Sequence, residues 1–168
     1  FYAWSVGLHA AAGHYDQALA DFQRAREIDP AFGLAYFHVG IAFFRAGRFE
    51  EAVDALEAGR RIADHPGWAE GVLAIIRLRR GDRDGALQMV REMTAQKARV
   101  NVSSVSLAQV LGALGDHDGA MRWLERGVEE HDSLVNFVHI YAEIFSPELA
   151  REPRFRRVLE RLDLAEIA

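Results

Sequence analysis

The side chains best suited to hold a metal ion or to move a proton are the histidines, of which the sequence has seven. Among them, His117 lies between Asp116 and Asp118, and His131 lies next to Asp132. A zinc site on a helix favours a His-x-x-x-His pair with a carboxylate nearby, because that spacing turns both rings to one face. None of the histidine groupings has this pattern. We therefore predict no metal site and interpret these residues as solvated loop residues.

Groups that could act as nucleophiles or bind phosphate are equally sparse. The chain contains no cysteine, and Lys97 is the only lysine among its 20 basic residues. A Gly-x-x-x-x-Gly-Lys phosphate loop is absent, and so is the Gly-x-Ser-x-Gly turn of many hydrolases. Ser103, Ser104 and Ser106 are interpreted as the polar start of a helix. Because no nucleophile, base and orienting acid fall into one pattern, we predict that the chain is not an enzyme and needs no cofactor.

Charge and hydropathy restrict the partners that the chain can have. The formal charge of -5 and the pI near 5.8 favour neither nucleic acid nor anionic lipid as a partner. No stretch approaches the roughly 20 apolar residues that span a bilayer. The lack of cysteine fits a reducing compartment, and we expect a cytoplasmic location. We also expect one folded domain that is a piece of a longer protein, because the helical pattern starts at Phe1 without a methionine.

The elements that must position any functional residue follow from an internal repeat. Glycines recur at equal intervals, and an alanine follows each of them five positions later: Gly13, Gly47, Gly81 and Gly115, with Ala18, Ala52, Ala86 and Ala120. A glycine can take the left-handed conformation that ends a helix. A small side chain lets two crossing helices approach closely. Each repeat is therefore predicted to be two helices joined at the glycine.

The spacing of these glycines, a period of about 34 residues, and the segments "AYFHVGIAFFRAGRFEEAVDALEAG" and "REIDP" closely resemble the tetratricopeptide repeat family. The resemblance implies an all-α solenoid, a right-handed superhelix of helix pairs with C-terminal capping helices. Four repeat-like pairs are expected in residues 1–132, at about 1–30, 31–65, 66–99 and 100–132. Residues 133–168 are expected to form the cap.

Residues 133–168 depart from the repeat, since Leu149 and Arg154 stand where its glycine and alanine should be. We expect an apolar helix from about Leu134 to Phe145 and a short helix after Ser146, capped by that side chain. A last helix near 154–163 should place four apolar side chains on one face, namely Phe155, Val158, Leu159 and Leu162. This tail resembles the C-terminal repeat regions of bacterial multidomain regulators, which implies a bacterial source.

In a stack of helix pairs the first helix of each pair lines the concave surface, so the informative residues lie on the first helices. The resemblance implies that Trp4 borders this groove. It also implies a predominantly apolar set of groove residues that would contact a partner: Phe37, His38, Ile41, Phe44, Arg45, Trp68, Val72, Ile75, Arg79, Ser106 and Gln109. Some members hold a C-terminal carboxylate there with polar side chains, and this chain lacks them.

Two functions stay open at this point. The chain is predicted to be a protein–protein interaction scaffold that binds a partner's helix or peptide in the apolar groove. The alternative is a regulatory or oligomerisation domain of a bacterial signalling protein or transcriptional regulator. Such a domain would dock on its own upstream domain or on a second copy, as a homodimer.

Overall fold

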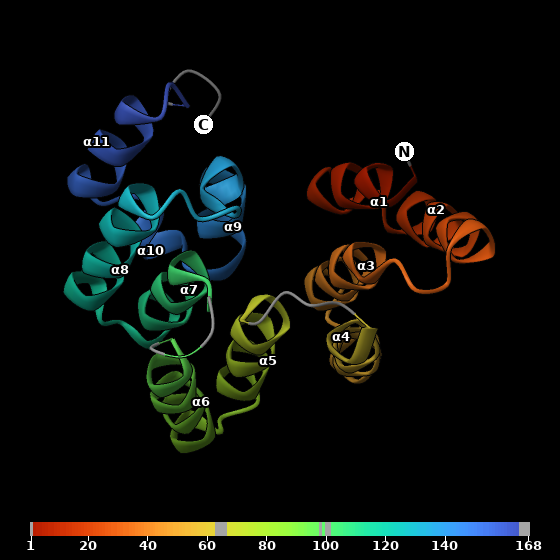
Figure 1. The fold of residues 1–168 in the computed structure, drawn as a ribbon, viewed down its shortest axis with the longest axis horizontal. Coiled ribbons are helices and arrows are strands. Elements are labelled where there is room, and N and C mark those ends of the chain that lie inside the picture. The colour runs from red at the N-terminus through yellow and green to blue at the C-terminus, as the bar shows by residue number, and fades with distance from the viewer. Residues whose placement is uncertain (1, 63–66, 98, 100–101, 165–168) are drawn as a thin grey trace. The chain divides into compact units, whose positions relative to one another are not determined.

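The computed structural model describes residues 2–62, 67–97, 99 and 102–164, and these are helical with no strand among them (Figure 1). The first four helix pairs are α1 (Tyr2–Ala11) and α2 (Tyr15–Ile28), α3 (Gly33–Arg45) and α4 (Phe49–Ile62), α5 (Trp68–Arg79) and α6 (Arg83–Gln96), and α7 (Ser104–Leu114) and α8 (His117–Glu129). They are followed by the 3-10 helix η1 (Val135–Phe137), α9 (Val138–Phe145), α10 (Pro147–Ala150) and α11 (Pro153–Arg161). The all-α helical repeat is confirmed.

Backbone contacts divide the chain into two compact units, residues 1–76 and residues 77–168, which we call unit 1 and unit 2. Unit 1 contains α1 to α4 and most of α5. Unit 2 begins with the last residues of α5 and contains α6 to α11. No helix in the described part of the chain is long and apolar enough to cross a membrane.

The evenly spaced glycines lie at the turns within the helix pairs, as predicted. Gly13, Gly47, Gly81 and Gly115 have φ of 78°, 74°, 85° and 86°. At the first turn, Gly13 N donates to Ala10 O at 3.2 Å and His14 N donates to His9 O at 2.8 Å. These two bonds satisfy carbonyls that the helix end would otherwise leave unpaired, and they require a left-handed residue. The other three turns have the same pair of bonds.

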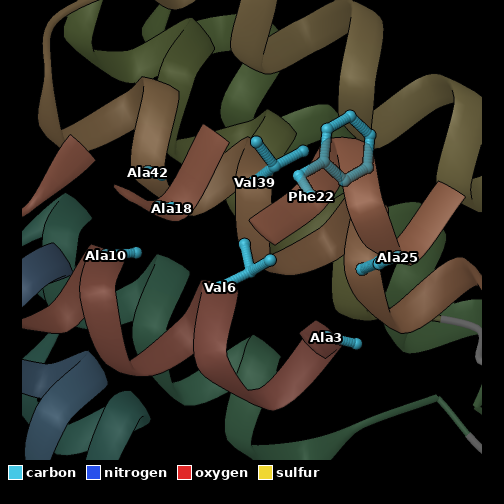
Figure 2. Close-up of a cluster of buried hydrophobic side chains, with 9 residues drawn as sticks. Ala3, Val6, Ala10, Ala18, Phe22, Ala25, Val39 and Ala42 are labelled. Carbon is cyan, nitrogen blue, oxygen red and sulfur yellow. The ribbon is translucent and has the colours of Figure 1, made fainter. Parts of the chain in front are cut away.

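The recurring alanines lie in the core, also as predicted, since all four have 0% exposure. In unit 1, Ala18 belongs to a cluster in which small side chains from α1, α2 and α3 surround a few large ones (Figure 2). Val6 of α1, Phe22 of α2 and Val39 of α3 meet there. The small residues allow close helix crossings, and the large ones fill the grooves beside them.

The tail of unit 2 differs from the sequence prediction in two details. The apolar helix does not run unbroken from Leu134, because a 3-10 turn over Val135–Phe137 precedes α9. Ser146 stands before α10 with Pro147 at its first position, but its side chain makes no capping hydrogen bond. The cap prediction for Ser146 was therefore wrong: its hydroxyl is buried and packs close to Gly112 of α7 instead.

Candidate functional site

The predicted groove residues lie on α3, α5 and α7, and most of them pack inside the protein. Eight of the eleven are buried: Phe37, His38, Ile41, Phe44, Val72, Ile75, Ser106 and Gln109. Arg45 and Trp68 are half-buried, and Arg79 is exposed. The buried members therefore support the packing of the first helices. Contact of the set with a partner stays a prediction.

Four aromatic rings of unit 1 form a continuous row across α1, α3 and α5. Ring centroids are 5.7 Å apart for Trp4 and His38, 5.8 Å for His38 and Phe37, and 5.3 Å for Phe37 and Trp68. We call these four residues the aromatic row. Its two middle members are buried, whereas Trp4 is 49% exposed and Trp68 is half-buried. The row thus brings a tryptophan to the surface at each end, and each of them contacts a buried ring.

His38 holds the middle of the aromatic row by a buried hydrogen bond. Its Nδ1 donates to Ala3 O of α1 at 2.7 Å, and a Cβ on Gly7 would come within 2.9 Å of the same ring. The glycine therefore makes the space that the imidazole fills. Burial lowers the pKa of His38, and the bond to the Ala3 carbonyl offsets only part of that effect. The ring is neutral at pH 7.

Trp68 and Phe37 also border a small pocket in unit 1 of about 20 Å³. Its wall includes Gly33, Gly59 and the guanidinium-bearing Arg60. A volume of this size holds about one water molecule. The pocket can receive the tip of one small side chain and no larger ligand.

Matches to protein-family models decide the family. The model described as "Tetratricopeptide repeat" matches residues 8–66, and a second model of the same description matches residues 67–92 and 102–126. Together they cover most of the helix pairs described above. The chain belongs to the tetratricopeptide repeat family.

Relatives of this tetratricopeptide repeat chain include longer eukaryotic proteins. It is 47% identical over 47 residues to "Small glutamine-rich tetratricopeptide repeat-containing protein 2" of Mycosarcoma maydis, covering 28% of this chain and 13% of that protein. It is 29% identical over 107 residues to "Protein SGT1 homolog" of Oryza sativa subsp. japonica, covering 64% of this chain and 28% of that protein. The chain thus spans less than a third of either relative. A bacterial source stays a prediction, as does the likeness of the tail to bacterial regulators.

Two solved structures are also similar to the chain. One is described as "YrrB: a TPR protein with an unusual peptide-binding site", with a TM-score of 0.49, 22% identity and coverage of 98% of this chain and 82% of that one. Another is "MamA AMB-1", with a TM-score of 0.47, 20% identity and coverage of 99% and 84%.

One cluster of unit 1 contains the residue types of a catalytic triad, and sequence reasoning missed it. The Ser5 hydroxyl donates to the Asp21 carboxylate, and His9 Nδ1 lies 3.2 Å from Asp21 Oδ2. A nucleophile needs a hydrogen bond to its base, whereas Ser5 and His9 both contact the acid. The cluster therefore links α1 to α2 as a structural contact. Among the described residues, no group of three or more histidine or carboxylate side chains converges as a metal site would require.

A second polar cluster, in unit 2, joins α6 to α7 and α8 through the only lysine. Lys97 Nζ donates to Val102 O at 2.7 Å and lies 2.8 Å from Glu130 Oε2. Burial alone would raise the pKa of Glu130, but hydrogen bonds outweigh it and lower the pKa to about 2. The donors are Lys97, Ser104 and Arg126. These contacts of Glu130 therefore join α8 to the end of α6 and the start of α7.

Acidification between pH 7.5 and 5.5 is expected to destabilise this protein through His38. Because its pKa is lowered in the folded state, the unfolded chain binds more protons below the unfolded value of 6.5. The stability that His38 contributes is thus present above pH 6.5 and is lost as pH falls. The limiting slope is about 1.4 kcal/mol per pH unit. Urea unfolding at several pH values should show a shallower slope for His38→Gln than for the parent. Identical slopes would contradict the assignment.

Proposed function

We propose that this chain is a protein-interaction scaffold whose unit 1 binds an apolar helix or peptide of a partner. The aromatic row is the observation that supports this proposal. Tryptophan is enriched among the residues that dominate binding energies, because it buries a large rigid surface. Trp4 and Trp68 carry such surface at positions where a partner can reach it. Phe37 and His38 fix them from below.

An exposed apolar neighbour strengthens the case on α1. Leu8 lies one helical turn after Trp4 and is 68% exposed. Residues four apart share one helix face, so this pair forms an apolar strip on the surface of α1. Exposed apolar strips of this kind suit a partner's amphipathic helix. Of the predicted groove set, Trp68 is then the residue that a partner contacts, with Phe37 packed against it. Ile41, Phe44 and Ile75 are buried and belong to the core.

Replacement of the surface tryptophans is expected to weaken partner binding strongly. Truncation of a hot-spot aromatic costs about 2 kcal/mol or more, so Trp68→Ala and Trp4→Ala should each raise the Kd roughly thirtyfold. A suitable ligand is a peptide selected from a displayed library for binding to the parent protein. Its affinity for each variant would be measured by calorimetry at two salt concentrations. Apolar burial should make the affinity nearly insensitive to salt.

The matched control is Glu57→Ala on α4, which removes an exposed ion pair with Arg60 and replaces no residue of the aromatic row. Its affinity for the peptide should equal that of the parent. Equal affinities of the tryptophan variants and the control, or loss of binding in moderate salt, would contradict the proposal. A parent protein that binds no peptide and self-associates in light scattering would favour the alternative, a domain that docks on a second copy.

A further inference from the structure

In unit 1, an arginine completes the end of the first helix. Arg45, the last residue of α3, donates from Nη1 to Ala10 O of α1 at 2.7 Å and also to Ala11 O. Ala10 O accepts a second bond from Gly13 N at the turn. Carbonyls at a helix C-terminus lack partners within the helix and carry partial negative charge, so a guanidinium group is well suited to this place.

In unit 2 the equivalent place holds no arginine. Two repeat lengths along the chain, Ala113 takes the position of Arg45, while Leu78 and Arg79 take those of Ala10 and Ala11. The turn is the same, since Gly81 N donates to Leu78 O at 3.0 Å. A methyl group on α7 thus stands where a guanidinium-bearing side chain starts in unit 1.

A pocket of about 530 Å³ lies at this place. Ala113, Leu78 and Arg79 all line it. The rest of its wall is formed by Gly112, Leu114, Gly115, His117, Pro147 and Glu148. Its volume falls in the range of binding pockets for small groups. The register of the repeat and the shape of unit 2 therefore identify the same spot independently.

The chemistry of the wall suits a cation with an aliphatic stem. The end of α5 supplies carbonyls with partial negative charge, and Glu148 supplies a carboxylate. Leu78, Ala113 and Pro147 offer apolar surface along which the methylene groups of an arginine can lie. The carbonyl of Leu114, at the end of α7, already accepts a bond from Arg83 Nη2 at 3.1 Å.

Two cationic groups of the wall must be weighed against this. The His117 imidazole lies 3.1 Å from Glu152 Oε1, which balances its charge when it is protonated. Arg79 has an exposed side chain, so water screens its charge, and its place in the register is that of the backbone acceptor Ala11. Glu148 is exposed as well, so water screens its charge in the same way. The carbonyls at the end of α5 then favour a cation in the pocket.

We propose that this pocket binds the guanidinium group of an arginine side chain presented by a partner protein. Every arginine of the sequence, and its one lysine, lies among the described residues, and Ala113 is what the repeat offers in place of Arg45. The occupant is therefore none of the basic side chains of residues 1–168, and we assign it to a partner protein. This inference rests on the proposed scaffold function, for which it names one side chain of the partner.

The test uses small probes, so it does not depend on an identified partner. Nα-acetyl-arginine amide is titrated into the labelled protein, and amide shifts of Ala113 and Gly115 are followed by NMR. We expect saturable shifts with this probe and none with Nα-acetyl-citrulline amide, a neutral molecule of nearly the same shape. Glu148→Gln should raise the Kd of the arginine probe two- to fivefold, because a partly exposed ion pair contributes up to about 1 kcal/mol.

A second experiment introduces the guanidinium group into the pocket by substitution. Ala113→Arg should raise the melting temperature and abolish the shifts caused by the probe, whereas Ala113→Leu should fill space without the rise. In unit 1, Arg45→Ala should lower the melting temperature, with partial recovery at high concentrations of the arginine probe.

Equal shifts with the citrulline probe, or no shifts at all, would overturn the proposal. So would shifts with Nα-acetyl-glutamate amide in place of the arginine probe, because they would assign the pocket to an anion held by Arg79 and His117. None of these outcomes touches the tryptophan variants of unit 1, so failure of the pocket and failure of the scaffold function are distinguishable.

Discussion

A chain that ends at Ser146 is expected to lose the cooperative unfolding of unit 2 and to associate in solution. The deleted segment contains four buried apolar side chains: Leu149, Phe155, Val158 and Leu159. Within unit 2, α10 packs on α9, and α11 packs on α8 and α10. Each buried side chain of this size contributes about 1.5–3 kcal/mol, so the sum rivals the total stability of a typical domain, about 5–15 kcal/mol. The deletion also uncovers the apolar faces that these side chains contact.

Urea unfolding followed by circular dichroism, together with light scattering at two protein concentrations, measures both effects. A chain that ends at Leu164 keeps all four side chains and is the matched control. Arg154→Ala removes only the ion pairs to Asp118 at 2.8 Å and Glu125 at 3.6 Å, which are partly exposed and should cost less than about 1 kcal/mol. If the chain ending at Ser146 were as soluble and as stable as the control, the capping role would be wrong.

The features of the fold that could be predicted are those in which a backbone conformation or a close helix crossing requires one particular type of residue. Gly47 was predicted at a turn because few residues other than glycine adopt φ of 74°, and Ala52 was predicted in the core because a crossing helix leaves room for a methyl group. Both requirements are local, and they recur at the same positions of each repeat. The helix pairs could therefore be placed from the sequence within a few residues.

The candidate site could be predicted only in part, because the repeat indicates which helix face a residue shares and not how deeply that face is packed. Phe37 was expected at a groove surface and is only 6% exposed, since its neighbours on α3 and α5 close over it. The hydrogen bond from His38 to Ala3 joins residues 35 positions apart, so the sequence does not indicate it. The one related feature in the sequence is Gly7, whose lack of a side chain leaves room for the His38 ring. Ser146 failed as a cap for a similar reason, since packing against α7 decides where its hydroxyl lies.

Gly40→Ala is expected to destabilise the parent protein but to stabilise the Leu56→Ala variant. A Cβ added at Gly40 would lie 2.6 Å from Leu56 Cγ and 2.7 Å from its Cδ2, and Leu56 has 0% exposure. The leucine has no solvent-facing side into which it could move. Gly40→Ala gains about 1 kcal/mol of helix propensity, but overpacking costs about 1–3 kcal/mol, so we expect net destabilisation.

Leu56→Ala alone should cost about 2–5 kcal/mol, because it leaves a cavity between α3 and α4. In that background Gly40→Ala no longer meets the leucine, fills part of the cavity and keeps its helix propensity. It should then stabilise the protein. A double-mutant cycle of urea unfolding free energies measures this coupling, for which we expect about 2 kcal/mol or more. Additive effects of the two substitutions would show that α3 and α4 shift apart at little cost, and that close contact at this crossing is not what the glycine provides.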